Sequence, residues 1–559
     1  MSNFLLTQTP IDMPAPLGFS DWLTFWLVVV VSAVNGVMLI LAGYKFLQVL
    51  QLSNYKMNGY FAWIKQDKGA YWGRLLILSF LSSACLLMTN VLLGDFFIYK
   101  IMEWLGLLFY LLFVTIFVIN RFSVPVKVPL RYTKRMIRLI VVTFILIFVV
   151  TLFLLNFTTI YIPYFKYGAV GLTPVMLPVF IILAYYIMLP YEKLKAKLYV
   201  KKASNKLQSH ESLIKIGITG SFGKTSVKNI LTAMLAEKYS VCSSPMSFNT
   251  TLGITKTINE DLKASNDVLI CEMGARFKGD IKEICDFVKP TIGVITGIGN
   301  QHLATFKTQE NLINTKLELC DSVLQSQGQM FFNADNSLTK SVAPKNKGNV
   351  VLTSLKSSKG EIRVDNIKVT NEGSEFDMIY NGQVQRCKTA LLGKHNISNI
   401  LLCATVALHL GVPFESICRS TKKLTPVAHR LALFPSANSL ILIDDAYNGS
   451  VEGAEAALEV LNQFEGQRFV ITPGLVELGS AQFDANFNFG KSLANVADYV
   501  IISGISNYEA IKSGLFYNNF DASHILRAGS NKQAVELMNN FAKAGDVVLF
   551  ENDLPDNFA

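Results

Sequence analysis

The chain has 559 residues, 51% of them hydrophobic, and its mean hydropathy is +0.35. A composition this apolar excludes an ordinary soluble enzyme, and the length predicts several domains. The formal net charge is +10, but the basic residues flank apolar runs, which indicates membrane-flanking loops and argues against nucleic-acid binding. The eight cysteines form no C-x-x-C pair, so we expect buried thiols rather than disulfides or a zinc site.

Apolar runs of membrane-spanning length dominate the first 190 residues. About 20 apolar residues are needed to cross the hydrocarbon core of a bilayer. We expect a tail over 1–21, a membrane domain over 22–190, and spans at about 23–44, 75–93, 104–120, 139–155 and 169–190. Pro174 and Pro178 are expected to kink the last span. The spans carry no charged residue, which argues against a transporter and favours an anchor or a lipid-facing platform.

The loops between these runs are alternately basic and nearly uncharged. The positive-inside rule then predicts a multi-pass protein of the cytoplasmic (inner) membrane. Its N-terminus would lie outside, and everything after Tyr191 in the cytoplasm. A basic juxtamembrane linker follows over 191–210. Its stretch "YEKLKAKLYVKKASNK" is either a helix lying on an anionic leaflet or a simple stop-transfer flank.

From Glu211 onward the composition is that of a globular protein, and a strand, a loop and a helix follow one another. "LIKIGITG" suits a buried parallel strand, and "SFGKTSVKNILTAMLAEKY" has helical spacing. A glycine-containing turn in this setting predicts a phosphate-binding loop, although Ile218 stands where the general pattern has its first glycine. Lys224 would reach the β- and γ-phosphates and Thr225 would hold Mg²⁺. The alternative is a glycine-rich turn with a solvated lysine.

Further strands end in polar residues. "DVLICEMGA" reaches its polar end at Glu272, "TIGVITGIGNQHL" before His302, and "QMFFNADN" before Asp335. The carboxyl ends of parallel strands are where α/β sheets bind ligands. These residues by themselves predict a phosphate-handling α/β domain.

Taken in order, these residues resemble the Mur ligase family. The resemblance covers roughly 211–559 and rests on "GITGSFGKTSVK", "SFNTTLG" (247–253), "EMGA" (272–275), "GIGNQHL" (297–303), "NTKLEL" (314–319), "NADN" (333–336), "GKHNISN" (393–399), "AHRL" (428–431) and "DDAYNGS" (444–450). "DDAYN" and "ELG" (477–479) are most similar to the D-alanyl-D-alanine-adding (MurF-like) branch. The resemblance implies a central ATP-binding domain with a parallel-rich sheet over 211–423. A Rossmann-like α/β domain would follow over 424–559, to which "SLILIDD", "QRFVITPG", "ADYVIISG" and "DVVLFEN" supply strands.

The resemblance implies an enzyme that joins an amino acid or peptide to a carboxylate while ATP is cleaved to ADP. The carboxylate would be phosphorylated to an acyl phosphate, from which the incoming amine displaces phosphate. ATP and Mg²⁺ at two sites are the implied cofactors. The implied ATP-binding residues are Gly220, Ser221, Gly223, Lys224, Thr225, Ser226, His395, Asn396, Asn399, Arg430 and Asp445.

The resemblance also implies a two-metal site. Thr225 and Glu272 would hold the Mg²⁺ that bridges the β- and γ-phosphates. His302 would hold a second Mg²⁺, supported by Lys316 after its carbamylation by CO₂, which requires a site that lowers the lysine pKa. Without the family, His302 would be a strand-end histidine bonded to the backbone and Lys316 a solvated charge beside Glu318. The implied catalytic residues are Lys224, His302, Lys316 and Arg430, and the implied substrate-binding residues are Asn249, Thr250, Tyr447 and Asn448.

Three departures from the family pattern concern the substrates. Membrane helices replace the domain that grips the uridine nucleotide, "DDAYNGSVEG" lacks the usual Asn-Pro, and the chain ends in "FENDLPDNFA" instead of a lysine-glycine-serine-arginine segment. The cell-envelope precursor therefore stays open between a nucleotide-linked and a lipid-linked form. The incoming amine, from an amino acid or short peptide, stays open as well. Membrane lipids and other envelope-biosynthesis proteins are the expected partners.

Two interpretations from other classes remain. A nucleotide-gated scaffold would need the phosphate loop but not Glu272, His302 and Lys316 together. A transporter with a regulatory nucleotide domain would need charged residues in its spans. The leading hypothesis is a membrane-anchored, ATP-dependent amide ligase of cell-wall (peptidoglycan) building.

Overall fold

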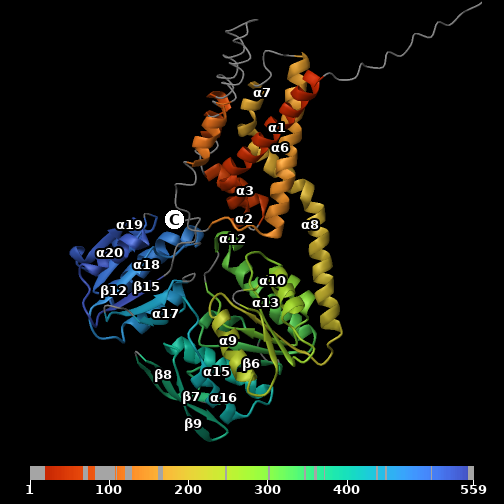
Figure 1. The fold of residues 1–559 in the computed structure, drawn as a ribbon. Helices are drawn as coiled ribbons and strands as arrows, with labels where there is room; N and C mark the ends of the chain where they lie inside the picture. The colour runs from red at the N-terminus through yellow and green to blue at the C-terminus, as the bar shows by residue number, and fades with distance from the viewer. Residues whose placement is uncertain are drawn as a thin grey trace, which may run out of the picture. The chain divides into compact units, whose positions relative to one another are not determined.

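The computed structural model divides the chain into two compact units, Met1–Lys195 and Ala196–Ala559. Its helices and strands are labelled in Figure 1. The residues that the structure describes are 19–53, 55–66, 74–77, 79–81, 108, 110–119, 129–161, 168–245, 248–299, 303–344, 348–357, 362–370, 372–435, 439–446, 450–476, 478–504 and 506–551.

The N-terminal unit consists of helices where it is described. These are α1 (Phe19–Ala42), α2 (Tyr44–Leu52), α3 (Met57–Gln66), α6 (Lys134–Tyr161), α7 (Gly168–Gly171), the short 3₁₀ helix η2 (Thr173–Met176) and the first part of α8 (Leu177–Gln208). Three helical stretches in the described residues are long and apolar enough to cross a membrane, namely Phe25–Ala42, Lys134–Phe157 and Thr173–Gln208. They contain most of the runs predicted at 23–44, 139–155 and 169–190. Tyr110–Ile119 is a shorter apolar helix inside the run predicted at 104–120, and most of 75–93 lies outside the described residues.

Both prolines for which the sequence predicted a kink in the last run lie near the starts of helical elements. Pro174 stands in the first turn of η2, and Pro178 is the second residue of α8. Proline is tolerated at these positions because the first N–H groups of a helix have no intrahelical acceptor. Pro190, in contrast, lies in the interior of α8.

A buried asparagine links the helices of the N-terminal unit. The Asn35 amide donates to the hydroxyls of Thr151 (3.0 Å) and Thr173 (3.2 Å), and it accepts from the Tyr110 hydroxyl (2.5 Å). These bonds join α1, α6 and η2 with the helix around Tyr110. Buried polar side chains are hydrogen-bonded in folded proteins, and here the partners lie on neighbouring helices.

The central sheet of the second unit has the strand order β2-β3-β1-β4-β5-β6, and every neighbouring pair is parallel. The strands are β1 (Ile214–Thr219), β2 (Val241–Ser243), β3 (Val268–Glu272), β4 (Ile292–Ile295), β5 (Gln329–Asn333) and β6 (Val350–Thr353). The four predicted strands β1, β3, β4 and β5 are confirmed as strands. Their apolar side chains are buried because helices cover both faces of the sheet.

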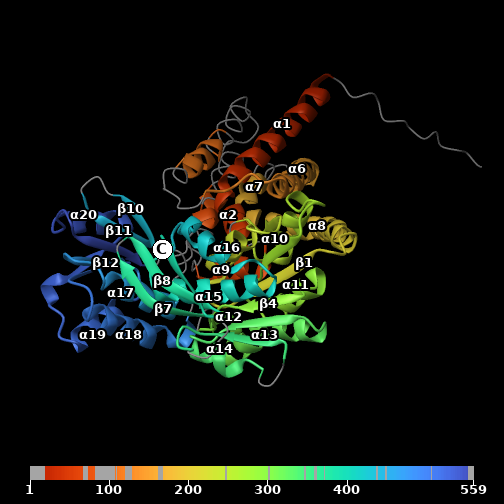
Figure 2. The same ribbon diagram turned by 90° about the horizontal axis from the view of Figure 1, so that it is seen from below.

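Helices from distant parts of the chain cover the two faces. One face packs against α9 (Lys224–Leu235) and α15 (Lys394–His409), which lie side by side in Figure 1 and Figure 2. The other face packs against α10 (Thr251–Glu260), α11 (Asp280–Val288), α13 (Gln309–Gln325) and α14 (Ser337–Val342). The short helices α12 (Leu303–Phe306), α16 (Phe414–Ser420) and η3 (Thr421–Lys423) complete the domain.

The sequence interpretation missed a second, three-stranded antiparallel sheet, β7-β8-β9. Its strands are β7 (Ile362–Thr370), β8 (Gly373–Tyr380) and β9 (Gln383–Thr389). Asn381 and Gly382 connect the last two with φ of 48° and 81°. An Asn-Gly pair between alternating strands is a strong hairpin signal, so the sequence did contain this information.

The second half of α8 belongs to the second unit. Ala203 and Leu207 are buried in the same cluster as Ile254 and Ile258 of α10. The Lys206 ammonium donates to the Ile258 carbonyl (2.8 Å), and the Asn259 amide donates to the Tyr199 carbonyl (3.0 Å). The predicted linker over 191–210 is therefore helical as far as Gln208, and its second half is packed on α10.

The C-terminal sheet has the order β10-β11-β15-β12-β13-β14. Its strands are β10 (Ala432–Pro435), β11 (Ile441–Asp445), β12 (Arg468–Thr472), β13 (Tyr499–Ser503), β14 (Ile525–Ala528) and β15 (Val547–Glu551). Only the pairing of β10 with β11 is antiparallel. The helices α17 (Val451–Leu461), α18 (Gln482–Ala494) and α19 (Tyr508–Tyr517) pack on one face, and α20 (Asn531–Asn539) packs on the other. Figure 2 shows α18 and α19 side by side.

Candidate active site

The loop between β1 and α9 wraps around the N-terminus of the helix. Gly223 caps α9 with a φ of +77°, in the left-handed region that favours glycine. A Cβ at Gly220 would lie 2.1 Å from Oγ1 of Thr296, so only glycine fits there. The Lys224 ammonium donates to the carbonyls of Gly220 (2.8 Å) and Ser221 (2.9 Å) and thus lies over the loop. Free N–H groups at a helix N-terminus and an adjacent ammonium are suited to bind phosphate.

A buried carboxylate lies beside this loop. Glu272, at the end of β3, is 1% exposed. Its oxygens accept from the Thr225 hydroxyl (3.0 Å) and the Asn249 amide (3.2 Å), and they lie 3.4 Å from the Lys228 ammonium. Gly274 makes room for Asn249, because a Cβ there would lie 2.7 Å from the asparagine side chain.

Four cationic side chains surround the loop and this carboxylate. Burial lowers the pKa of Lys224 to about 8, the charge of Glu272 opposes this shift, and the charge of Arg430 adds to it. Burial also lowers the pKa of Lys228, and the charge of Arg430 lowers it further against Glu272. Lys316 in α13 is 3% exposed, and burial, followed by the charge of Lys224, lowers its pKa to about 7. So much positive charge around one carboxylate is a suitable environment for a polyanion.

Three of the predicted ATP-binding residues, His395, Asn396 and Asn399, lie at the start of α15. A Cβ at Gly223 would be 3.5 Å from Oδ1 of Asn399, which places Asn399 at the phosphate loop. The Asn396 amide instead donates to the Leu392 carbonyl (2.8 Å) and stabilises the turn before the helix. Burial lowers the pKa of His395 to about 4, against the charge of Glu459, so its imidazole is neutral at pH 7.

The C-terminal domain brings Arg430 and Asp445 to the same region. Asp445 ends β11, accepts from the Leu431 N–H (3.1 Å), and lies opposite Glu551 of β15. Burial raises the pKa of Asp445 to about 6 and that of Glu551 well above its usual value. The charge of Arg430 lowers the pKa of both Asp445 and Lys224, against burial in the first case and together with burial in the second.

Two further contacts join the domains. The Lys394 ammonium in α15 lies 3.2 Å from the Glu459 carboxylate in α17. A Cβ at Gly299, in the loop after β4, would lie 2.2 Å from a carboxylate oxygen of Glu452. The C-terminal domain therefore touches the middle domain at both α15 and the loop after β4.

Some predicted site residues are not placed. His302, Tyr447 and Asn448 lie outside the described residues. Ser226 is half-buried in the first turn of α9, and the Thr250 hydroxyl caps α10 by accepting from the Gly253 N–H (3.3 Å). Among the described residues no cluster of three or more His, Cys, Asp or Glu side chains is placed to hold a metal. A magnesium site near the loop would therefore depend on Glu272 and Thr225, whose oxygens are donors that Mg²⁺ accepts.

Two functional candidates were missed at the sequence level. Lys228 lies one turn after Lys224 and contacts Glu272, and it belongs to the quoted motif "GKTSVK". Its i,i+4 spacing from Lys224 places both on one helix face, which was a usable signal. Glu551 is fully buried beside Asp445. No local pattern signals that pair, because β11 and β15 are far apart in the sequence.

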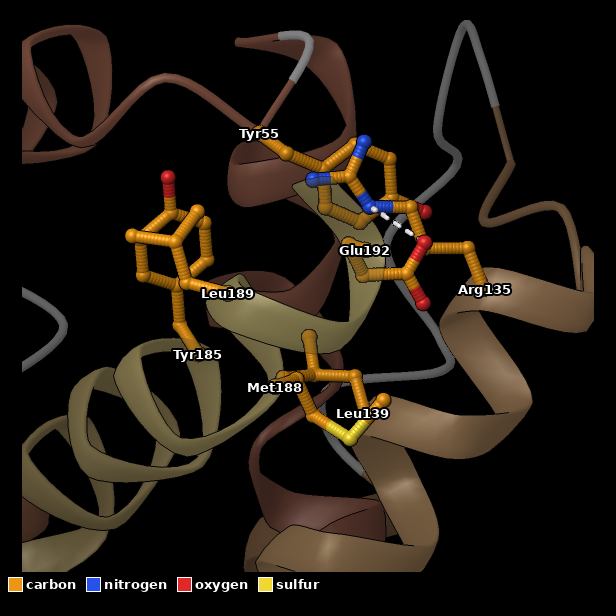
Figure 3. A pocket seen from close by; sticks show the side chains of 7 residues that line it. All are labelled: Tyr55, Arg135, Leu139, Tyr185, Met188, Leu189 and Glu192. Carbon is orange, nitrogen blue, oxygen red and sulfur yellow. Dashed lines mark ion pairs between the residues drawn. The ribbon is translucent and has the colours of Figure 1, made fainter. Parts of the chain in front are cut away.

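A pocket in the N-terminal unit is separate from these residues (Figure 3). It is lined by Tyr55, Arg135, Leu139, Tyr185, Met188, Leu189 and Glu192. The Arg135 guanidinium lies 3.9 Å from the centre of the Tyr55 ring and 4.0 Å from the Glu192 carboxylate. A volume of about 10 Å³ holds no more than a water molecule, so this pocket is not a substrate site.

The site combines a phosphate loop, a buried carboxylate and surrounding cations on a parallel sheet, and a second α/β domain follows. This combination defines a phosphate-handling α/β enzyme. The sequence matches the family model described as Mur ligase middle domain over residues 218–407. Residues 429–551 match a second family model, which is described as "Mur ligase, glutamate ligase domain". The chain belongs to the Mur ligase family and is an ATP-dependent, ADP-forming amide ligase of the MurF-like type.

Several relatives bear the name UDP-N-acetylmuramoyl-tripeptide–D-alanyl-D-alanine ligase. The protein from Mycobacterium tuberculosis is 28% identical over 355 residues, which cover 60% of this chain and 69% of the relative. That from Bacillus subtilis is 25% identical over 346 residues, covering 60% and 72%.

Solved structures agree with this assignment. The MurF ligase of Thermotoga maritima in complex with ADP matches with a TM-score of 0.56 and 25% identity, covering 64% of this chain and 80% of that one. MurF from Acinetobacter baumannii matches with a TM-score of 0.57 at 22% identity, covering 64% and 77%, which shows the fold alone.

Proposed function

We propose that this chain is a membrane-anchored ligase of cell-envelope building. It activates a precursor carboxylate as an acyl phosphate and joins it to the amine of an amino acid or short peptide. The observation that carries the proposal is the position of Lys224 over the phosphate loop and of Lys228 beside Glu272. The charges of Arg430 and of buried Lys316 add to the positive charge around Lys224. The γ-phosphoryl group and the carboxylate are both anionic, so a site that transfers one to the other needs this excess of positive charge.

The residues around the loop would bind ATP. Backbone N–H groups of Gly220, Gly223 and Ser226 would face the phosphates, and Lys224 would neutralise the β- and γ-phosphates. Ser221, whose N–H donates to the Gly297 carbonyl (2.6 Å), would hold the loop in shape around them. His395 and Asn396 would form the adenine side, Asn399 would bind the nucleotide next to the phosphate loop, and Asp445 would bind the ribose. Glu272 and Thr225 would hold Mg²⁺, which when bound neutralises the charge that develops on the transferred phosphoryl group.

Lys316 would serve as a carbamate. The reaction of an amine with CO₂ requires the neutral amine, and burial lowers the pKa of Lys316 to about 7, so a large fraction is neutral at physiological pH. The carbamate is an anion, which reverses the charge at this position. Together with His302 it would support the second Mg²⁺ near the acyl substrate, where Asn249 and Thr250 would contact the carboxylate.

The amine would attack once the C-terminal domain has closed. Arg430, Tyr447 and Asn448 come from this domain, and its contacts through Glu452 and Glu459 hold it against the middle domain. Closure would exclude water, which otherwise hydrolyses an acyl phosphate. The amine then displaces phosphate, and ADP and phosphate leave.

We further propose that the acyl substrate is a muramoyl-peptide precursor presented at the membrane in lipid-linked form. The relatives are named for a UDP-linked tripeptide and D-alanyl-D-alanine. However, neither matching family model reaches the N-terminal unit, where the long apolar helices lie. The soluble nucleotide precursor is the alternative, because the family match extends over both ligase domains.

ADP release in membranes that contain the full chain tests the proposal. We expect release that depends on both a precursor and an amine and that is lost in Lys224→Ala. A chain that begins at Ala196 keeps the second half of α8 and separates the two precursors. Full activity of this chain on the nucleotide precursor, with no gain from the lipid-linked one, would favour the alternative. No turnover of any precursor and amine by the full chain would contradict the proposed reaction.

A further inference from the structure

Lys228 is a buried cation that contributes to the positive charge of the site, but the proposed reaction gives it no contact with the phosphates, the metal or the substrate. It lies in α9, one turn after Lys224, and is 2% exposed. Lys224 is half-buried and lies over the loop, whereas the Lys228 ammonium lies 3.4 Å from Oε2 of Glu272. Lysine is almost never fully buried unless it is paired, so this contact explains its position.

Glu272 shares its two oxygens among three donors. Oε2 accepts from the Thr225 hydroxyl (3.0 Å) and faces Lys228, while Oε1 accepts from the Asn249 amide (3.2 Å). Within the described part of the chain, Lys228 is the cation that forms an ion pair with this carboxylate. A carboxylate that is 1% exposed costs several kcal/mol unless a cation compensates its charge.

We propose that Lys228 is the resident counter-ion of Glu272. It supplies the positive charge beside the carboxylate before Mg²⁺ binds, and it opposes Mg²⁺ with the same charge afterwards. This inference rests on the proposed role of Glu272 as a magnesium ligand. Its consequence is a moderated affinity for Mg²⁺, so that the metal is bound firmly only together with the nucleotide phosphates.

The contacts of Glu272 determine which way the affinity changes when Lys228 is removed. Thr225 and Asn249 still hold one carboxylate oxygen each, so the carboxylate keeps its orientation. Only the repulsion between two cations at the same carboxylate disappears. Lys228→Met therefore binds Mg²⁺ more tightly, although the protein without metal is less stable.

A double-mutant cycle on the full chain in detergent, with EDTA present, tests the ion pair. Lys228→Met is expected to lower the thermal midpoint of the ligase unit by on the order of 10 °C, because one member of a buried pair is left uncompensated. Adding Glu272→Gln is expected to restore most of that loss. Lys282→Met serves as a matched control, because its ion pair with Asp286 is 64% and 63% exposed, and it is expected to change the midpoint by less than about 2 °C. Additive effects of the two substitutions would overturn the inference.

Mg²⁺ binding to the same variants at saturating ADP tests whether Lys228 weakens the affinity for Mg²⁺. Fluorescence of a labelled ADP reports the Mg²⁺ concentration at half-saturation. We expect about tenfold tighter binding in Lys228→Met and little change in Lys228→Arg. Unchanged or weaker binding in Lys228→Met would overturn the inference. Wild-type affinity in Glu272→Gln would overturn the magnesium role of Glu272, and the cycle in EDTA would still decide separately whether the ion pair exists.

Discussion

The two units of this chain place their apolar and polar side chains in opposite ways. In the N-terminal unit, large apolar side chains such as Trp26, Phe153 and Ile187 are 57–62% exposed, and polar Asn35 is buried at 1%. In the second unit, the apolar strands are buried under helices, and polar side chains gather at strand ends around the phosphate loop. The contrast supports a hydrocarbon environment for the first unit and an aqueous one for the second. It also predicts that substitutions in each unit affect different properties.

The largest expected effect is the loss of ATP cleavage in Lys224→Ala. This ammonium lies over the loop that would hold the phosphates, and removing such a charge is expected to lower ADP release by about 10³-fold or more. The association of the chain with membranes should not change, because no residue of the N-terminal unit is altered. Lys422→Ala, at an exposed position, is the matched control and should keep wild-type activity. Substantial ADP release by Lys224→Ala would contradict the assignment of the loop.

The pH dependence of activity tests Lys316. Its pKa of about 7 lies well below the usual value for lysine, so the neutral amine that CO₂ requires is lost as the pH falls through 7. Activity should therefore fall about fivefold between pH 7 and pH 6, following the neutral fraction, and added bicarbonate should raise it. Lys316→Met should lose the bicarbonate response. A profile that rises toward lower pH would argue against the carbamate.

A smaller effect is expected where the chain is cut within α8. A chain that begins at Ala196 keeps Ala203 and Leu207 on α10, whereas one that begins at Ser209 exposes Ile254 and Ile258. We expect the shorter chain to lose roughly 2–5 kcal/mol of stability, in line with the loss of a buried leucine and its neighbours. Denaturant unfolding of both chains measures the difference. Equal midpoints would show that the second half of α8 adds nothing to the ligase unit.

The smallest expected effect is that of Asn35→Ala. It removes the bonds to Thr151, Thr173 and Tyr110. Interhelical hydrogen bonds in apolar bundles contribute roughly 0.6 kcal/mol each on average, so the loss of three is expected to cost about 2 kcal/mol. Thermal unfolding of the full chain in detergent should show a destabilised N-terminal unit and an unchanged ligase unit. A drop in ADP release of the same size as in Lys224→Ala would contradict the separation of the two units.

The strands and the phosphate loop were predictable from the sequence, because their signals are local. Strands β1 and β3 are short apolar runs, and the glycines and Lys224 follow the first one directly. The partner of Lys228 was not predictable, because Glu272 lies 44 positions away and reaches it only through the parallel pairing of β1 with β3. The pairing of Asp445 with Glu551 was hidden for the same reason.

The helix that joins the two units shows another limit of sequence reasoning. Composition separates the apolar residues 169–190 from the basic residues that follow, and this predicted a boundary near Tyr191. The helix continues past this boundary, because Lys and Ala are good helix formers and because Ala203 and Leu207 pack on α10. The helix therefore runs on to Gln208.

The proposed reaction requires a carboxylate of the precursor to become an acyl phosphate before the amine attacks. The most direct measurement supplies the full chain with a muramoyl-tripeptide precursor, UDP-linked or lipid-linked, whose carboxylate carries ¹⁸O, together with D-alanyl-D-alanine and ATP. We expect one labelled oxygen in the released phosphate for each amide bond formed, and ADP rather than AMP as the nucleotide product. Amide formation with unlabelled phosphate, or with AMP as product, would contradict the proposed reaction.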